Sequence, residues 1–263
     1  MFKETREGRE EIIPAVERLY SFIGRVAEKY RAEGVPVRAD GRIDMLAYKG
    51  IHPDLDADLA KNSELDDAWF KDVPKDRRQS AKLALEGEQL EMLAYGVFVK
   101  NLGKNFIVAR ASEHDDRINK ADTVILDKDS GELICAFDEV SATSGSDFEE
   151  KLGKVKNRNF QGGAKLKYGI GVKKVGEKRV VMAASVESLP IFYIALPSDR
   201  IKKGIKEFNP DQNTQSDFEK NLFKYFVATL NAQIQGLKLY GNRLDPKLKE
   251  RLQVFETLLR NLN

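Results

Sequence analysis

The sequence predicts an α/β protein in which a mixed central β-sheet is flanked by helices, with a helical N-terminal extension and further helices at the C-terminus. Apolar residues recur every three to four positions over 12–30 and again over about 75–100, as in amphipathic helices. From about 105 to 196 the chain changes to short β-type runs with one helix among them, and helical periodicity returns near residue 216. Helices before and after a β-rich middle are typical of a sheet covered by helices.

Start and stop signals support the expected helices. The helix over 12–30 is ended by Gly34 and Pro36, and a short helix ends before Pro74. A long helix is expected over about 75–100 because this segment is rich in good helix formers.

The two C-terminal helices also have recognisable starts. Ser216 and Glu219 have the spacing of a capping box, and Asp245-Pro246 has the residues that begin a last helix. We therefore expect the chain to end in helices.

Turn residues separate the β-type runs. The segment 127–131 has turn chemistry, so the runs on either side of it are predicted to form a hairpin. A helix is expected at about 147–159, between the third and fourth runs. The predicted strands are 105–111, 123–126, 133–140, 166–172, 179–184 and 191–196.

The chain has 263 residues, which is long enough to bury a full core without disulfides or a structural metal. One large domain with a helical extension is favoured over two equal domains. Pro74 marks the expected boundary between a helical N-terminal extension, 1–74, and an α/β domain with C-terminal helices, 75–263.

The composition limits the kinds of metal site and the compartment. Cys135 is the only cysteine, which excludes a disulfide within the chain and a cysteine zinc site. The only histidines are His52 and His114, so a metal would be held largely by oxygen, which favours Mg²⁺ or Mn²⁺. No apolar segment has the length of a signal peptide or membrane helix. We expect a cytoplasmic protein without a membrane partner.

Acidic residues stand at the ends of the predicted hairpin strands. Asp122 opens one strand, and Asp138 and Glu139 lie near the end of its partner, so strand pairing brings carboxylates close together. A divalent cation would remove their repulsion. Because side chains alternate along a strand, only one of Asp138 and Glu139 is expected to point into the shared site. Alternatively, these residues cap a turn or lie partly exposed at a sheet edge.

The segment just before the hairpin contains further candidates. Asp115 and Asp116 are able to reach the same metal, or they form a solvated loop or a salt bridge to Arg117. His114, beside them, is interpreted as a loop residue rather than a ligand.

This layout resembles the PD-(D/E)XK nuclease superfamily over about 83–196: a helix bearing glutamates, a hairpin opened by an aspartate, then an acidic strand followed by a helix. The resemblance implies a restriction-endonuclease-like fold and a Mg²⁺ or Mn²⁺ cofactor. It also implies a helix acid, Glu88 or Glu91. The implied metal ligands are Asp122, Asp138, Glu139 and Glu91.

In that family a lysine two positions after the strand acid orients or activates the attacking water. Here Glu139-Val140-Ser141 occupies the place of Glu-x-Lys, so serine replaces this lysine. The family is known to relocate the lysine to the following helix, where Lys151 and Lys154 lie one turn apart. The catalytic residues that the resemblance implies are Asp122, Asp138, Glu139, Lys151 and Lys154.

A basic stretch follows the acidic strand. Between residues 151 and 179 there are ten lysines and arginines but one acidic residue, Glu177. Such an excess is typical of a surface that contacts a nucleic-acid backbone, although a solvated helix face is an alternative. The predicted nucleic-acid-binding residues are Lys154, Lys156, Arg158, Lys165 and Lys167.

Two functions therefore remain open. The first is a Mg²⁺-dependent nuclease that hydrolyses phosphodiester bonds of DNA or RNA. The second is a catalytically degenerate nuclease-like protein that binds nucleic acid or serves as a scaffold, which Ser141 favours. A hydrolase of another class is set aside because the sequence shows no Ser/His/Asp or Cys/His arrangement and no phosphate-binding glycine motif.

Overall fold

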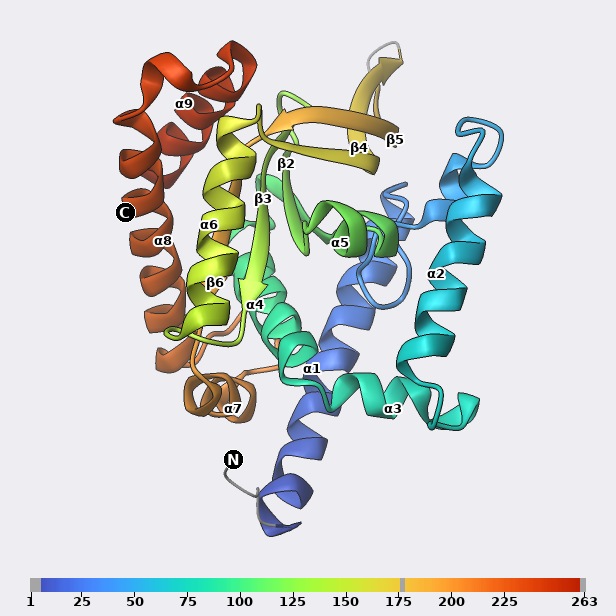
Figure 1. The fold of residues 1–263 in the computed structure, drawn as a ribbon. Helices are drawn as coiled ribbons and strands as arrows, with labels where there is room; N and C mark the ends of the chain where they lie inside the picture. The colour runs from blue at the N-terminus through green and yellow to red at the C-terminus, as the bar shows by residue number, and fades with distance from the viewer. Residues whose placement is uncertain (1–5, 176–177, 261–263) are drawn as a thin grey trace.

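The computed structural model describes residues 6–175 and 178–260, and it has a mixed β-sheet flanked by helices (Figure 1). The mixed α/β class predicted from the sequence is confirmed. Within the described residues the central sheet has the strand order β1-β2-β3-β6. Its strands are β1 (Phe106–Arg110), β2 (Thr123–Asp127), β3 (Leu133–Val140) and β6 (Ile191–Ala195).

The pairing of these strands brings the acidic residues together. β1 pairs with β2 and β2 with β3 in antiparallel fashion, so the predicted hairpin is present. Thr123 at the start of β2 lies opposite Phe137 near the end of β3. β3 runs parallel to β6, with Val140 opposite Ala195. The residues that precede β2 and those that end β3 therefore share one edge of the sheet.

Helices cover both faces of this sheet. Phe192 of β6 contacts Phe255 of α9 (Pro246–Arg260) at 5.2 Å between ring centroids, whereas the next residue, Tyr193, contacts Phe148 of α6 (Ser146–Phe160) at 6.0 Å. Successive residues of a strand point to opposite faces, so α9 and α6 lie on opposite sides. All eight residues of β3 are buried as a result, including its two acids.

An aromatic cluster joins three helices to the sheet. Phe98 of α4 (Glu86–Leu102) stacks on Phe137 of β3, with ring centroids 4.9 Å apart. Phe226 of α8 (Asp217–Lys238) lies 5.4 Å from Phe98, and Phe255 lies 6.3 Å from Phe137. Aromatic pairs in such contact contribute roughly 0.5–1.5 kcal/mol beyond their buried area. The cluster fixes α4, which carries the helix glutamates, against the sheet.

The N-terminal region is helical and attached to the sheet. It contains α1 (Arg6–Ala32), the 3₁₀ turn η1 (Met45–Tyr48) and α2 (Leu55–Trp69). Between α1 and η1 the chain pairs with β1: the amide of Arg110 donates to the carbonyl of Gly41 at 3.0 Å. Gly41 has φ +77°, and a Cβ there would lie 3.2 Å from both Ile23 and Tyr95. Only glycine fits this approach without displacement of its neighbours.

A two-stranded ribbon projects from the body of the protein (Figure 1). It consists of β4 (Ala164–Val175) and β5 (Lys178–Leu189), which are longer than the predicted strands and form a sheet of their own. The ribbon is attached where the amide of Val172 donates to the carbonyl of Gly131, in the β2–β3 turn, at 3.0 Å. Gly131 has φ +77° and closes this contact without a side chain.

Two predicted segments differ from the structure. The single helix expected over 75–100 is divided into η2 (Lys75–Arg77), α3 (Arg78–Leu83) and α4, because Leu85 has the extended conformation φ −74°, ψ 131°. α3 has no buried residue whereas most of α4 is buried. Packing of α4 against the sheet therefore determines its direction, and helix propensity does not.

The segment interpreted as a loop around Asp115 forms a helix, α5 (Glu113–Asn119). The Ser112 hydroxyl caps this helix by accepting from the amide of Asp115 at 3.0 Å.

The C-terminal part that follows β6 is mainly helical, as predicted, and contains one helix that the sequence did not indicate, α7 (Ser198–Glu207). The predicted capping box of Ser216 and Glu219 is present at the start of α8. A 3₁₀ turn, η3 (Gly241–Arg243), precedes α9, which begins at Pro246 as predicted. No helix in the described part of the chain has the length and hydropathy needed to cross a membrane.

Asn159, which is buried, fastens α6 to β6 and provides a test of the packing. Its Nδ2 donates to the carbonyl of Ile191 at 2.7 Å, and its Oδ1 accepts from the amide of Ile191 at 3.0 Å. Asn159→Ala should lower the free energy of unfolding by about 1–3 kcal/mol for each buried group left unpaired. Urea denaturation followed by circular dichroism measures this loss. Asn157→Ala, on the exposed side of α6, is the control and should change it by less than about 0.5 kcal/mol; equal losses would contradict the assignment.

Candidate metal centre

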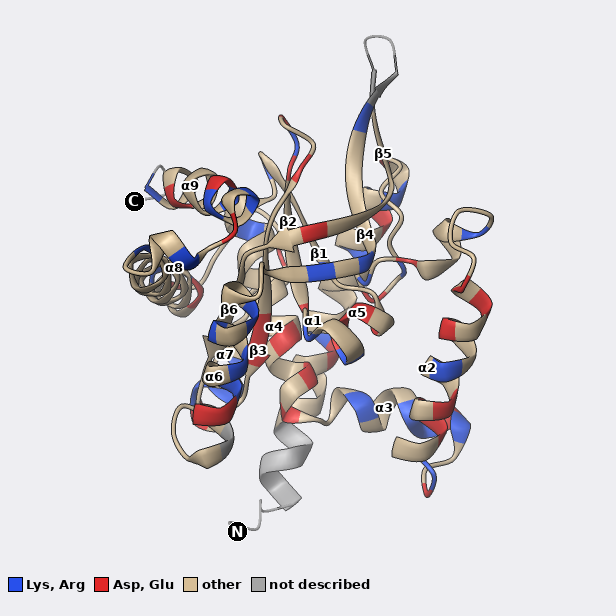
Figure 2. Ribbon diagram, turned by 45° about the horizontal axis from the view of Figure 1, so that its top comes forward, with Lys and Arg blue, Asp and Glu red and all other residues tan. Residues whose placement is uncertain are grey.

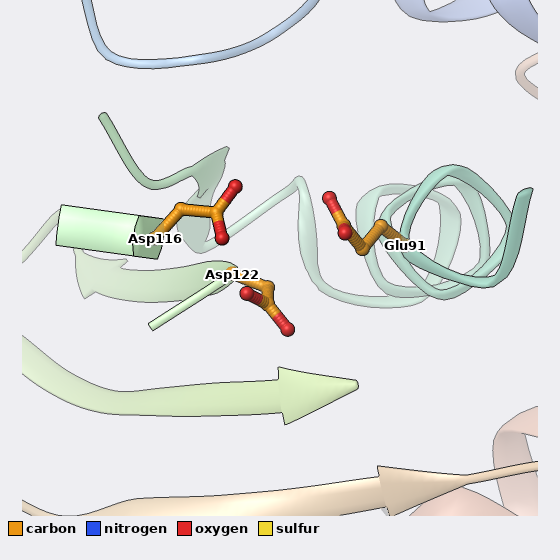
Figure 3. Close-up of side chains that lie close together, drawn as sticks. All are labelled: Glu91, Asp116 and Asp122. Atoms are coloured by element: carbon orange, nitrogen blue, oxygen red, sulfur yellow. The ribbon is translucent and has the colours of Figure 1, made fainter. Parts of the chain in front are cut away.

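Three carboxylates converge at the edge of the sheet where β2 begins and β3 ends. Glu91, Asp116 and Asp122 each offer an oxygen atom, and these three atoms lie within 4.8 Å of one another. Figure 3 shows the three side chains directed toward one another from three different elements. Asp122 is 7% exposed, whereas the side chains of Glu91 and Asp116 are 15% and 26% exposed, so the cluster reaches from the interior to the solvent.

Each of these side chains is positioned by its local structure. Glu91 lies in the second turn of α4, on the side that faces the sheet. Asp116 belongs to the first turn of α5, which the Ser112 cap holds beside the start of β2. Asp122 directly precedes β2, and its amide donates to the carbonyl of Phe137 at 2.8 Å. The three acids therefore come from two helices and one strand end.

Asp138 and Glu139 lie beside this cluster but on opposite faces of β3. The side chain of Asp138 faces α6, where Lys151 Nζ lies 3.6 Å from Asp138 Oδ1. Glu139 points to the face of α4, and burial together with the charge of Glu91 raises its pKa. The backbone amide of Glu139 also donates to Asp122 Oδ2 at 2.7 Å. The structure thus brings Asp122, Glu91 and Glu139 together, and the group of three within 4.8 Å contains Asp116 in addition to two of the predicted ligands.

The buried carboxylate of Glu139 has no well-formed hydrogen bond, although the side chains of Thr123 and Asp122 lie close enough to lower its pKa against the effect of burial. The residue is 5% exposed, and neither Oε1 nor Oε2 has a hydrogen-bond partner among the described residues. The hydroxyl of Thr123, the next residue after Asp122, is buried without a partner as well. Buried polar atoms are nearly always satisfied in folded proteins. Unpaired carboxylate oxygens next to three further acids are what a cation site requires.

Burial and mutual repulsion weaken the acidity of these groups. Burial, with the neighbouring carboxylates of Glu91 and Asp116, raises the pKa of Asp122 well above its ordinary value. Burial and Glu91 raise the pKa of Glu139 to about 8. Burial also raises the pKa of Asp138, although Lys151 opposes this change. A bound cation would reverse these effects because it stabilises the ionised carboxylates.

Two buried arginines neutralise part of the cluster. Arg42 Nη1 donates to Asp116 Oδ2 at 2.7 Å, and Arg42 Nη2 donates to Glu91 Oε2 at 2.9 Å. Arg110 Nη2 lies 2.6 Å from Glu91 Oε2 and 2.7 Å from Glu88 Oε1. Although burial works against ionisation, Arg110 and Arg42 lower the pKa of Glu88 to about 2. Glu88 is therefore a structural partner of the arginines, and Glu91 is the helix acid that faces Asp122.

The candidate lysines differ in their surroundings. Lys151 lies beside Asp138 and is 47% exposed, whereas Lys154 is 68% exposed and pairs with Glu150 at 2.5 Å. Ser141 follows β3 directly and supplies no charge. Of the two candidates, Lys151 is the one in contact with an acid of β3. In Figure 2 acidic residues lie along β3 and basic residues along the neighbouring helix α6.

The predicted nucleic-acid-binding residues largely contact other parts of the protein. Lys156 Nζ lies 5.0 Å from the ring centroid of Tyr240, and Arg158 is half-buried. Lys165 pairs with Glu187 at 3.1 Å, and Lys167 pairs with Asp58 of α2 at 2.6 Å. The side chains of Lys174, Lys178 and Arg179, and all of Glu177, lie outside the described residues.

Asp115 and His114 serve the fold rather than the cluster. The carboxylate of Asp115 is fully buried and accepts from the amides of Lys167 and Tyr168 at 2.8 and 2.9 Å. It joins α5 to the ribbon and is not a solvated loop residue. The ring of His114 packs against that of Tyr168, with centroids 5.4 Å apart.

The donor set fits a hard divalent cation. Its atoms are carboxylate oxygens, and both histidines lie against Tyr168 instead of the cluster. Mg²⁺, Mn²⁺ and Ca²⁺ prefer such ligands. Sequence reasoning found Asp122, Glu139 and Glu91 but missed Arg42 and Arg110. No local pattern marks these arginines, because their partners are 19 to 74 residues away in the sequence.

The metal-free protein should lose stability as the pH rises. Glu139 has an ordinary pKa of 4.5 and a folded-state pKa of about 8, so between these values the folded state binds more protons than the unfolded chain. The free energy of unfolding must therefore fall as pH rises through this window. Thermal unfolding in EDTA at pH 5, 7 and 9 measures the trend. Glu139→Gln should flatten it, whereas Glu149→Gln, exposed on α6, should leave it unchanged; a flat wild-type profile would contradict this account.

Comparison of the chain with models of protein families, with curated proteins and with solved structures gave no match. The restriction-endonuclease-like topology accordingly stays an expectation from the sequence. The feature that points to a function is the close arrangement of four carboxylates, those of Glu91, Asp116, Asp122 and Glu139.

Proposed function

We propose that the chain is a Mg²⁺- or Mn²⁺-dependent nuclease of the PD-(D/E)XK type, which hydrolyses phosphodiester bonds of DNA or RNA. The observation that carries this proposal is the convergence of Glu91, Asp116 and Asp122 beside the unpartnered carboxylate of Glu139. Carboxylates held this close favour a divalent cation. When bound, such an ion withdraws charge from a phosphoryl oxygen and acidifies water, which is the chemistry that phosphodiester hydrolysis needs.

The residues of the chain have separate roles in this proposal. Asp122 is the central ligand, because it faces Glu91 and Asp116 and also accepts from the Glu139 amide at 2.7 Å. This hydrogen bond fixes one oxygen of Asp122 and leaves the other for the cation. Glu139 holds the inner side of the site and Asp116 the outer, partly exposed side.

Lys151 supplies the positive charge that Ser141 lacks. Its amine is 3.6 Å from Asp138, on the face of β3 opposite Glu139, and it is half-exposed, so it can offer a positive charge to a phosphate that reaches this end of the sheet. Lys120 is a further cation in the field of Asp138. Basic groups at the rim would offset the repulsion between phosphate and the acidic cluster. The proposed partner is therefore a nucleic-acid backbone.

A second function has its own support. Ser141 stands where the family has its lysine, and Arg42 and Arg110 satisfy oxygens of Glu91 and Asp116 without any metal. A protein that kept the fold while it lost catalysis would retain such a self-satisfied cluster. This alternative is a degenerate nuclease-like protein that binds nucleic acid or acts as a scaffold.

Asp122→Asn tests catalysis. The change keeps the size of the side chain but removes the charge of the central ligand, so cleavage of labelled DNA or RNA in Mg²⁺ or Mn²⁺ should fall by about 100-fold or more. A gel assay with plasmid, duplex, single-stranded DNA and RNA substrates measures it. If the wild-type protein cleaves none of these and yet binds one of them, the scaffold function replaces the nuclease.

The two candidate lysines form a matched pair for a second test. Lys151→Ala removes the amine beside Asp138 and should reduce the cleavage rate by at least about tenfold, as loss of a charge-stabilising group does. Lys154→Ala, one turn later on the same helix, removes an exposed amine paired with Glu150 and should change the rate less than about threefold. Single-turnover rates distinguish the two variants. Equal effects would show that α6 contributes only general charge.

A further inference from the structure

The buried arginines suggest how many cations the candidate centre takes, an inference that rests on the proposed function. Arg42 is 1% exposed and lies between two of the carboxylates, with Asp116 Oδ2 at 2.7 Å and Glu91 Oε2 at 2.9 Å. A guanidinium keeps its charge at every pH at which the protein is folded. The guanidinium of Arg42 is thus a fixed positive charge that bridges two carboxylates on one side of the acidic cluster.

Some carboxylate oxygens of the cluster accept hydrogen bonds from the protein, and the others do not. Glu91 Oε2 accepts from both Arg42 and Arg110, Asp116 Oδ2 accepts from Arg42, and Asp122 Oδ2 accepts from the Glu139 amide. Among the described contacts this leaves one oxygen on each of Glu91, Asp116 and Asp122, besides the two oxygens of Glu139. One oxygen from each of Glu91, Asp116 and Asp122 lies within 4.8 Å of the others, a separation that suits one ion. Between Glu91 and Asp116 the Arg42 guanidinium already supplies a positive charge, so a second ion that shares these two ligands would be repelled there.

Backbone hydrogen bonds on both sides of Arg42 fix its position. Gly41 accepts from the Arg110 amide at 3.0 Å, and the Ile43 amide donates to the Arg110 carbonyl at 2.9 Å, so Arg42 is held directly beside Arg110. Gly41 has φ +77°, and a Cβ on it would press on Ile23 and Tyr95 at 3.2 Å. These contacts place the arginine in the site before any ligand binds.

We infer that Arg42 takes the place of a second cation, so that the centre binds a single divalent ion. The N-terminal segment then contributes a positioning residue to a site whose acids come from the α/β part of the chain. Arg42 does this by holding Glu91 and Asp116 through one oxygen each, beside Asp122.

Counting the bound ions tests this inference on the full chain. Mn²⁺ is titrated into the metal-free protein, and the bound ion is counted by calorimetry and by electron paramagnetic resonance. One ion per chain is the expected result, without spin coupling between neighbouring ions. Two ions of similar affinity, with such coupling, would overturn the inference and leave the nuclease proposal standing. Absence of binding would overturn both.

Variants at Arg42 test whether this residue replaces a cation or only supports the fold. Arg42→Met removes the charge but keeps the length, so the first ion should bind at least about fivefold more tightly, or a second ion should appear, because less positive charge opposes it. Arg42→Lys should restore binding of one ion near the wild-type affinity. Arg38→Met, which removes a guanidinium bonded to Asp40 and Glu113, is the control and should leave the ion count unchanged.

Weaker binding by Arg42→Met, with a wild-type circular dichroism spectrum, would show that Arg42 only supports the fold and would overturn its role as a cation substitute. If Arg42→Met does not fold, the ion count of the wild-type chain and of Arg42→Lys decides the question. Two spin-coupled ions in either protein would contradict the inference, and one ion in each of them would support it.

Discussion

Two guanidinium groups buried among carboxylates hold together four elements of the chain. Arg42 comes from the N-terminal region and Arg110 from the end of β1, while Glu91 belongs to α4 and Asp116 to α5. Burial of an unpaired guanidinium is costly, so the fold favours the state in which these pairs form together. The positions of Glu91 and Asp116 are therefore tied to folding itself. Removal of Glu91 would take a partner from both Arg42 and Arg110, and it would also take a ligand from the proposed cation site.

Much of the fold could be predicted because its signals are local. The hairpin follows from the turn at 127–131, and the start of α8 follows from the spacing of Ser216 and Glu219. The split of 75–100 at Leu85 could not be predicted, because α3 and α4 have similar helix propensity but different burial. The ribbon of β4 and β5 was predicted as strands, but the local sequence does not indicate that they form a sheet of their own. The contact that attaches this sheet joins Val172 to Gly131, which lies far from it in the sequence.

The candidate site was partly predictable for the same reason. Antiparallel pairing in a hairpin and alternation along β3 predicted that only one of Asp138 and Glu139 would point into the site with Asp122. The structure shows which one: Glu139 lies beside Asp122, and Asp138 turns toward α6. Which helix glutamate faces the site depends on the orientation of α4, which the aromatic contact between Phe98 and Phe137 sets. Arg42 lies in an irregular stretch without periodicity. Its bonds to residues 49 and 74 positions away leave no trace in the local sequence.

Both edges of the central sheet are covered, one by the N-terminal segment and the other by a side chain of α8. On the β1 side, Gly41 and Ile43 occupy the backbone groups of Arg110. On the β6 side, Gln233 of α8 accepts from the amide of Tyr193 at 3.0 Å and donates to its carbonyl at 2.9 Å, so a side chain takes the place of a neighbouring strand. Open strand edges are where chains add to one another and aggregate. At these positions a second molecule finds no free donor or acceptor, so self-association of this protein by strand addition is blocked there.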